Sequence, residues 1–341
     1  MSNAFMISRR RMLQLAGASV PVSFLPGGFG SVALAAQSWD LACEYNATSY
    51  PVQLAGRFAE ELAQRSGNAL TIKIHPGASL GYKSADQFYA VADGALAMAF
   101  TLLPTLGGID PLFEISTIPF MAVNLAEARA LTEIGRKHLS PVFEQNNQRQ
   151  LFTETDPGSG IWAKRPIESV ADLQGLRIRT FDANSTRTME AAGAVPFQLA
   201  WADVVPQLAA GAIDAVLTSA EGGALIALWE HTPFFNELNY SMSAHAAHVN
   251  LESLNALPEE LQEAVLAISG EIDAFIWENQ SDRIAAANKR IADAGTTVVD
   301  TFSDDIFAHL RKAGEATLDT WLVRSGDAGR ALIDEYRAAT L

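Results

Sequence analysis

The sequence predicts an α/β fold of two lobes with one long helix that braces both. Three patterns support this prediction: strands and helices alternate along residues 39–100, the alternation returns along residues 176–217, and a helical face extends from Pro258 toward Gly295. Alternating strands and helices are typical of a parallel sheet with crossover helices. A chain of 341 residues is long enough to form two separate hydrophobic cores.

The first half of the chain begins with an apolar strand pattern over residues 39–45. Apolar residues then recur on one helical face over residues 52–66, and a glycine ends this helix. Residues 70–74 alternate as a half-buried strand does, a second helix is expected over 84–93, and a strand follows over 96–100. Ligands of such sheets bind where the carboxyl ends of the strands open into a crevice.

The second half has the same rhythm. A helix is expected over residues 125–144 and a strand over 176–180. Helical patterns follow over 185–192 and 204–210, and residues 213–217 form an apolar strand pattern. The repeated order of elements is the reason for predicting a second lobe.

A long helical pattern begins at Pro258, and proline is a residue that favours the first turn of a helix. It covers about 37 residues, which would span about 55 Å if continuous. Since a lobe is shorter than this, we expect the helix to brace both lobes. The alternative is a pair of helices that meet at Gly270.

The N-terminus resembles an export signal. Residues 8–14 (SRRRMLQ) resemble the twin-arginine signature, in which paired arginines precede a short apolar stretch. An interrupted apolar run follows, and residues 33–36 (ALAA) form a small-x-small cleavage pattern. Prolines and glycines make the run a poor candidate for a membrane span. We therefore expect a mature periplasmic protein; the alternative is a basic N-terminal tail.

The charge of the chain argues against nucleic acid as a partner. The sequence has 24 basic and 39 acidic residues, and loss of the signal would leave 21 against 39, a net charge of −18. Such a chain is repelled by phosphate backbones and by anionic membranes. One buried arginine can nevertheless hold an anionic ligand locally.

The single cysteine, Cys43, has no partner for an intrachain disulfide. An aspartate three residues before it spoils a lipoprotein cleavage box. We expect Cys43 to be a small apolar residue in the first strand.

Short blocks of sequence occur in a specific order along the mature chain. The most specific block is KRPIESVADLQGLRIR, which ends at Arg179. The others are HPGASLG (75–81), GALAMA (94–99) with IPF (118–120), GAVPF (193–197), WADV (201–204) and LAAGAID (208–214). Together they resemble the DctP-type solute-binding proteins of tripartite ATP-independent periplasmic (TRAP) transporters. The resemblance covers nearly the whole mature chain.

This resemblance implies a two-lobed periplasmic binding protein fold. We expect a signal peptide over residues 1–36, lobe I over 37–155 with about 245–280, and lobe II over 156–244 with about 281–341. It also implies that the protein captures a small organic acid and delivers it to an integral-membrane TRAP permease, without a cofactor. Relatives are mostly monomers, so we expect a monomer; the alternative is pairing through the helical C-terminal segment.

Arg179 ends the most specific block, where the resemblance assigns an arginine to the ligand's carboxylate. A guanidinium group pairs with both carboxylate oxygens and stays charged when buried. Arg177 alternates with Arg179 along the same strand, so only one of the two should face the cleft. The alternative role for Arg179 is a salt bridge on the surface of the lobe.

The resemblance also places Trp201 against the ligand, although burial in a core is the alternative. A tryptophan offers an apolar face and one N–H donor. Thr218 and its neighbour Ser219 match a polar contact just after the strand 213–217. Asn46 matches another polar position in the cleft, and an ordinary turn asparagine is nearly as good an explanation.

One departure from the family pattern bears on the ligand. Many relatives carry a second arginine shortly before the most specific block, whereas residues 155–162 (TDPGSGIW) contain none. A second carboxylate clamp is therefore not expected, unless Lys83 supplies the cation. Trp162 and Trp201, with Phe100 near the cleft, favour an aromatic or branched monocarboxylate over a C4-dicarboxylate.

No other pattern competes strongly with this interpretation. An exported α/β enzyme is the least favoured alternative, because we recognise no G-x-S-x-G elbow, no H-E-x-x-H helix and no G-x-G-x-x-G turn. His245 and His248 are expected to be packed rather than to bind a metal, and no metal ligand is predicted. Glu221 stays open as a ligand contact or as a holder of a bridging cation. A partner of a sensor kinase, in place of a permease, is the other alternative.

Overall fold

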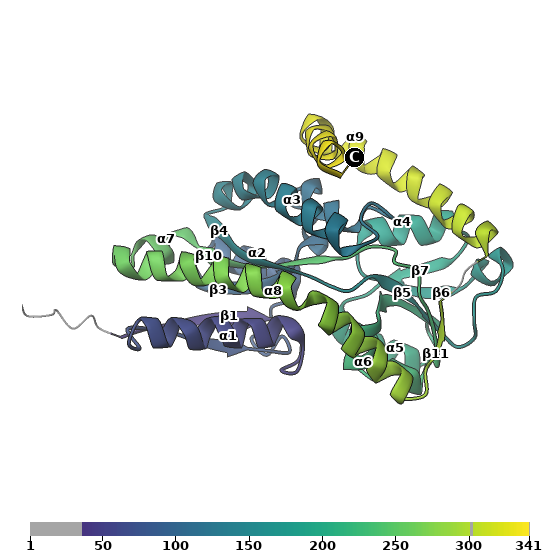
Figure 1. Cartoon of the computed structure of the whole chain (residues 1–341), viewed down its shortest axis with the longest axis horizontal. Coiled ribbons are helices and arrows are strands. Elements are labelled where there is room, and N and C mark those ends of the chain that lie inside the picture. Colours follow the sequence, from purple (N-terminus) through teal and green to yellow (C-terminus); the bar gives the residue numbers. More distant parts are fainter. Residues whose placement is uncertain (1–35, 301–302, 341) are drawn as a thin grey trace, which may run out of the picture. The chain divides into compact units, whose positions relative to one another are not determined.

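The computed structural model describes residues 36–300 and 303–340, which form one compact unit (Figure 1). The predicted signal peptide therefore lies outside the described residues except for Ala36. Among the helices of these two ranges, none combines the length and the apolarity that a membrane crossing requires.

Two sheets organise the described part of the chain, and the mixed α/β fold agrees with the prediction. The first sheet has the strand order β2-β1-β3-β10-β4. Its strands β1, β2 and β3 are parallel, and β10 is antiparallel to both β3 and β4. The bounds are β1 (Gln37–Cys43), β2 (Leu70–His75), β3 (Met98–Leu102), β4 (Gln148–Thr155) and β10 (Ala244–Asn250).

The second sheet has the order β11-β9-β5-β8-β6-β7. Strand β8 pairs in parallel with β6 and antiparallel with β5, so β8 lies in the middle of the sheet. The bounds are β5 (Ser159–Ala163), β6 (Arg177–Thr180), β7 (Val195–Gln198), β8 (Ala215–Ser219), β9 (Phe234–Asn236) and β11 (Thr297–Val299).

Helices around the first sheet form as their apolar periodicity predicts. In α1 (Tyr50–Arg65) a proline occupies the first turn, and Leu54, Phe58 and Leu62 are buried in the core of the first sheet. The other helices are α2 (Ser84–Ala92), α3 (Leu125–Gln145) and α7 (Leu251–Asn255), with the 3₁₀ turns η1 (Leu103–Leu106) and η2 (Pro111–Thr117).

Short helices cover the second sheet. Asp182 caps α4 (Ala183–Ala191) by accepting the backbone N–H of Ser185 at 2.8 Å. The others are α5 (Val204–Ala209) and α6 (Ala220–Leu225), with the 3₁₀ turns η3 (Val170–Leu173), η4 (Trp201–Asp203) and η5 (Leu228–Glu230). We call the first sheet with α1–α3 lobe I and the second sheet with α4–α6 lobe II; the predicted lobe boundaries stay a proposal.

The chain crosses between the sheets along two adjacent segments. Residues 156–158 connect β4 to β5, and residues 237–243 connect β9 to β10. These segments are hydrogen-bonded to each other, because the N–H of Asp156 donates to Ser243 O and that of Ser159 to Ser241 O, both at 2.9 Å. The paired crossing brings polar residues to the boundary of the lobes.

The long helix α8 (Glu259–Asp293) is continuous over 35 residues, so it does not break at Gly270. Ile268 and Ile272 pack in the core of the first sheet, whereas Ala287 and Ile291 pack beneath the second (Figure 1). The predicted bracing helix is confirmed.

The last helix, α9 (Asp304–Thr340), changes direction at Gly326, whose φ of 61° is not helical. Before the kink, Ile306 and Leu310 pack in the core of the second sheet. After it, Leu332 and Tyr336 pack with residues of α3. Both parts of α9 thus bury an apolar face within this chain.

Candidate functional site

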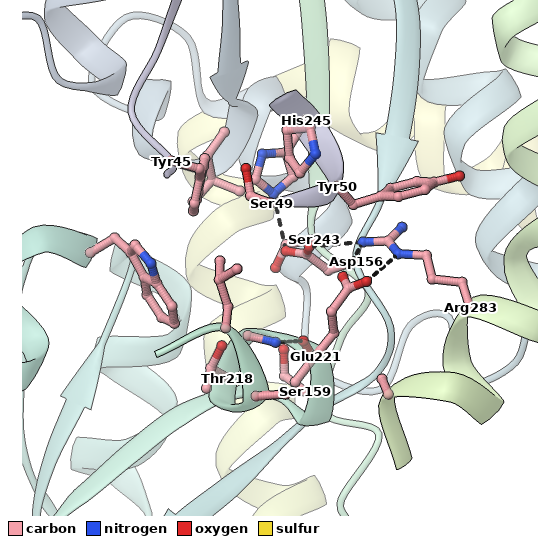
Figure 2. A pocket seen from close by; sticks show the side chains of 18 of the residues that line it. Tyr45, Ser49, Tyr50, Asp156, Ser159, Thr218, Glu221, Ser243, His245 and Arg283 are labelled. Carbon is pink, nitrogen blue, oxygen red and sulfur yellow. Dashed lines mark hydrogen bonds and ion pairs between the residues drawn. The ribbon is translucent and has the colours of Figure 1, made fainter. Parts of the chain in front are cut away.

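A cavity of about 310 Å³ lies between residues of the two lobes (Figure 2). Lobe I contributes Tyr45 and Tyr50, which follow β1. Lobe II contributes residues at the carboxyl ends of β6 and β8, where ligands of α/β sheets bind. The paired crossing and α8 complete the wall.

Arg179 carries a buried positive charge on this wall. Its side chain lies at the end of β6 and is 4% exposed, whereas Arg177 points outward and pairs with Asp214 at 2.7 Å. Nε of Arg179 donates to Leu199 O at 3.1 Å and Nη1 to Leu217 O at 3.4 Å. Burial lowers the pKa of Arg179 to about 10, so it stays charged at neutral pH. No carboxylate of the described residues pairs with it.

Two aromatic residues from opposite lobes stand beside this guanidinium. Trp201 opens η4, and its ring centroid is 6.3 Å from that of Tyr45 and 5.4 Å from Cζ of Arg179. Tyr45 was missed by the sequence analysis, although its place directly after β1 is a signal for the crevice.

Thr218 and Ser219 are the last two residues of β8, rather than the residues that follow the strand, and both line the cavity. Ser219 caps α6, because its Oγ accepts the N–H of Gly222 at 3.1 Å. A Cβ at residue 222 would collide with Oγ1 of Thr218, so glycine lets α6 start close to that hydroxyl. The Thr218 hydroxyl is therefore held at the cavity wall.

Three residues that we expected at the ligand do not line the cavity. Trp162 is fully buried in β5, where its Nε1 donates to Ser219 O at 3.1 Å and its ring packs on Phe235. Phe100 is buried in β3 against Phe152, at 5.3 Å between ring centroids. Asn46 is exposed in a turn, and its Oδ1 accepts the N–H of Thr48 at 3.2 Å. Asn46 is therefore an ordinary turn asparagine, which was the alternative explanation for it.

Lys83 lies outside this cavity. Its ammonium group is 3.5 Å from Asp203, and both side chains are half exposed. A neighbouring cavity of about 410 Å³ includes Lys83 and shares Tyr45, Arg179 and Trp201 with the first.

An acidic cluster lies next to α8, and we define it as Glu154, Asp156, Glu221, His245 and Arg283. All of these residues except Glu154 line the cavity (Figure 2). Arg283 donates through Nε to Glu221 at 2.8 Å and lies 2.6 Å from Glu154. His245 Nε2 lies 3.0 Å from Oδ2 of Asp156. Of this cluster, sequence reasoning had singled out only Glu221 and His245.

The cluster has unusual ionisation. Burial raises the pKa of Glu154 to about 7. Burial opposes charge on His245 too, but Asp156 and Glu154 outweigh it and raise the pKa of His245. Burial would likewise raise the pKa of Asp156, yet His245 and Arg283 hold it below its ordinary value. Asp156 is therefore an ionised acceptor at neutral pH.

Ligand atoms of Glu154, Asp156 and His245 lie within 4.8 Å of one another, a spacing that a metal ion could bridge. Arg283 already supplies a cation to this cluster at 2.6 Å from Glu154. The positive charge of Arg283 therefore already balances part of the negative charge of these carboxylates. The cavity wall thus carries Arg179 on lobe II, and beside α8 it carries the acidic cluster and the exposed Arg290.

The sequence interpretation took a G-x-S-x-G nucleophile elbow to be absent, but residues 77–81, GASLG, match that pattern. In the structure they form a turn after β2, and α2 does not start until Ser84. An elbow needs its serine on a direct strand-to-helix turn, so this segment lacks that geometry.

The family model of the bacterial extracellular solute-binding proteins, family 7 (DctP), matches residues 43–323. The C4-dicarboxylate-binding periplasmic protein DctP of Rhodobacter capsulatus is 26% identical over 250 residues, covering 70% of this chain and 72% of that protein. The 2,3-diketo-L-gulonate-binding periplasmic protein YiaO of Escherichia coli (strain K12) is 23% identical over 284 residues, with coverages of 80% and 83%.

Among solved structures, DctP7 of Bordetella pertussis, an extracytoplasmic solute receptor binding pyroglutamic acid, is similar with a TM-score of 0.85. It is 26% identical, and the match covers 89% of this chain and all of that one.

Proposed function

Because the chain belongs to family 7 of the bacterial extracellular solute-binding proteins, the DctP family of TRAP transporters, we propose that it captures a small monocarboxylate with Arg179 and delivers it to a TRAP permease. The family and its fold are those of periplasmic receptors rather than enzymes.

The observation that carries the proposal is the unpaired charge of Arg179. Its guanidinium is buried at a cavity wall, and its protein partners are two backbone carbonyl groups. A buried charge without an opposite charge is costly, so an anionic ligand stabilises this arrangement. A carboxylate matches the planar fork of a guanidinium.

The other walls favour one carboxylate rather than two. Tyr45, Phe181 and Trp201 offer aromatic faces near Arg179, which suits an aromatic, cyclic or branched body. The acidic cluster beside α8 would repel a second carboxylate. Trp162 and Phe100 do not line the cavity, but these three rings do, so we place aromatic, cyclic and branched monocarboxylates first and C4-dicarboxylates second.

Pyroglutamate is the first acid to try, because the similar receptor DctP7 of Bordetella pertussis binds pyroglutamic acid. Thr218 and Ser219, at the end of β8, supply hydroxyl groups for further polar contacts.

Capture by this protein requires the lobes to close on the ligand. The paired segments 156–158 and 237–243 connect the two lobes, and Tyr45 and Trp201 approach from opposite lobes. A ligand shifts the lobes toward the closed state only if it makes extra contacts there. The Arg179–carboxylate pair, enclosed by the two aromatic rings, is such a contact.

We propose the lobe boundaries as predicted, a monomer, and export through the twin-arginine-type signal in residues 1–36. A thermal-shift screen of the mature protein tests the ligand class, since a compound that binds only the folded state raises the melting temperature. The screen covers pyroglutamate, aromatic acids, branched hydroxy and keto acids, and C4-dicarboxylates. A rise with monocarboxylates supports the proposal, and a rise confined to dicarboxylates contradicts it.

A further inference from the structure

The acidic cluster contains one carboxylate that is free to contact a ligand. We propose that Asp156 selects the ligand by accepting a hydrogen bond from an N–H group, so the ligand is a monocarboxylate that also carries an amide, lactam or ammonium N–H. This inference rests on the proposed function, because it takes the ligand's carboxylate to be at Arg179.

Asp156 differs from the other two carboxylates of the cluster because it combines a free acceptor oxygen with a place on the cavity wall, whereas the oxygens of Glu154 lack hydrogen-bond partners but are buried away from the cavity. Glu154 is 0% exposed, and Arg283 donates to both oxygens of Glu221. The side chain of Asp156 is 30% exposed and lines the cavity. Its Oδ2 faces His245, whereas its Oδ1 is 3.8 Å from Arg283, beyond hydrogen-bond distance. An ionised carboxylate has about four acceptor sites, so Oδ1 can accept from a ligand.

The position of Asp156 is fixed rather than adaptable. Its N–H donates to Ser243 O at 2.9 Å within the paired crossing, and His245 holds its side chain. An acceptor that is held in place discriminates strongly between a ligand with a donor and one without, because the wrong ligand leaves the acceptor unpaired.

The charge of the cluster excludes a second carboxylate from this side. Three carboxylates, those of Glu154, Asp156 and Glu221, face only Arg283 and His245. Arg283 cannot act as a second clamp, because Glu221 and Glu154 already occupy it. An N–H donor, neutral or positive, meets neither obstacle.

Unpaired polar atoms in the described part of this wall point the same way. His245 is 1% exposed and lines the cavity, yet its Nδ1 has no hydrogen-bond partner. Oγ1 of Thr155, the last residue of β4, and Oγ of Ser241, on segment 237–243, are also buried without partners, although neither residue lines the cavity. Buried polar groups are normally paired, so this wall suits a polar ligand group rather than an apolar one.

Two sets of matched probes test the inference by calorimetry on the mature protein. Butyrate, 4-aminobutyrate and succinate share a four-carbon chain and end in a methyl, an ammonium and a carboxylate group. Pyroglutamate and 5-oxotetrahydrofuran-2-carboxylate share a ring in which only N–H is replaced by O. We expect each N–H compound to bind about 10- to 100-fold more tightly than its matched compounds.

The variant Asp156→Asn keeps the size of the side chain and removes its charge. We expect it to reduce the lactam-to-lactone ratio of affinities about 3- to 10-fold, because the asparagine amide keeps a neutral acceptor but loses the stronger, charged one. Asp203→Asn is the matched control: it removes one charge at the half-exposed pair with Lys83, outside this cavity, and should keep the wild-type ratio.

The inference is overturned if wild-type protein binds the lactone as tightly as the lactam, if succinate binds more tightly than 4-aminobutyrate, or if Asp156→Asn keeps the full preference. It is also overturned if neither N–H probe binds to protein that binds another monocarboxylate. A ratio of two affinities measured on the same variant does not depend on the stability of that variant. If Asp156→Asn does not fold, the affinity ratios of the wild-type protein decide the question.

The variant Arg179→Gln tests the proposed function separately from the role of Asp156. If Arg179→Gln leaves the affinity for every probe unchanged, the proposed function fails. If Arg179→Gln abolishes binding while the wild-type ratios are close to one, only the role of Asp156 fails.

Discussion

Arg283 and Glu221 form an ion pair that joins α8 to the start of α6, with Nε of Arg283 donating to the Glu221 carboxylate at 2.8 Å. The same guanidinium donates to Thr155 O at 3.0 Å and stacks on the ring of Tyr50 at 3.8 Å. Arg283 therefore ties the long helix to both lobes. Its charge is fully used by protein groups, so among the described residues that line the cavity Arg179 is the buried arginine that stays available to a ligand, while Arg290 is exposed.

We predict that Arg283→Gln lowers the free energy of unfolding by roughly 3–5 kcal/mol, because it leaves buried carboxylates without their cation. Urea unfolding of the mature protein measures the change. Arg290→Gln, an exposed arginine two turns further along α8, is the control and should stay within about 0.5 kcal/mol of wild type. Equal effects of the two variants would contradict the role of Arg283.

The buried carboxyl group of Asp182 should make the stability of the protein depend on pH. Burial raises the pKa of this carboxyl to about 6, although Ser185 and Thr117 donate to it. A carboxyl with a raised folded pKa costs stability as pH rises from about 4 toward 7, because the folded state must release a proton that it holds more tightly.

We therefore expect Asp182→Asn, which can still cap α4, to gain stability relative to wild type by roughly 3 kcal/mol between pH 4 and 7. The difference between the two proteins is the quantity to measure. The pKa of His248, which burial lowers to about 3, acts in the opposite direction and cancels in that difference. A difference that does not change with pH would show that Asp182 titrates normally.

Trp162 should matter for stability and not for ligand preference. Trp162→Phe removes the donor to Ser219 O, and an unpaired buried carbonyl costs roughly 1–3 kcal/mol. Trp229→Phe, at a partly buried tryptophan of the same lobe, is the control and should cost less. Chemical unfolding together with calorimetry separates the two effects. A changed ranking of ligands in Trp162→Phe would restore it as a ligand contact.

Lys83→Ala should change the affinity for the ligand by less than about 1 kcal/mol, because the pair with Asp203 is half exposed and weak. A much larger loss, measured by calorimetry, would mean that Lys83 is the second cation that the sequence left open.

The sequence predicted helices better than it predicted the site. Apolar residues of α1 and α8 recur with helical periodicity over many residues. The sequence could therefore predict that both helices exist and that α8 braces both lobes. Strands β3 and β5 are buried on both faces, so alternation could not tell which side Phe100 and Trp162 would face. These two residues were assigned to the ligand for that reason.

The acidic cluster could not be predicted from local patterns. Asp156 and His245 are 89 residues apart, and Glu221 and Arg283 are 62 apart, so no spacing in the sequence connects them. They meet because the paired crossing, α6 and α8 converge on one cavity wall. Arg179 was accessible from sequence because it ends a block that the family shares.

The most direct test of the central claim is calorimetry of Arg179→Gln and Arg177→Gln with the ligand found in the thermal-shift screen. The two arginines share strand β6, but only Arg179 lines the cavity. We predict that Arg179→Gln folds and loses roughly 2–5 kcal/mol of binding free energy, whereas Arg177→Gln binds as wild type does. An Arg179→Gln protein that keeps its affinity within about threefold would contradict the account.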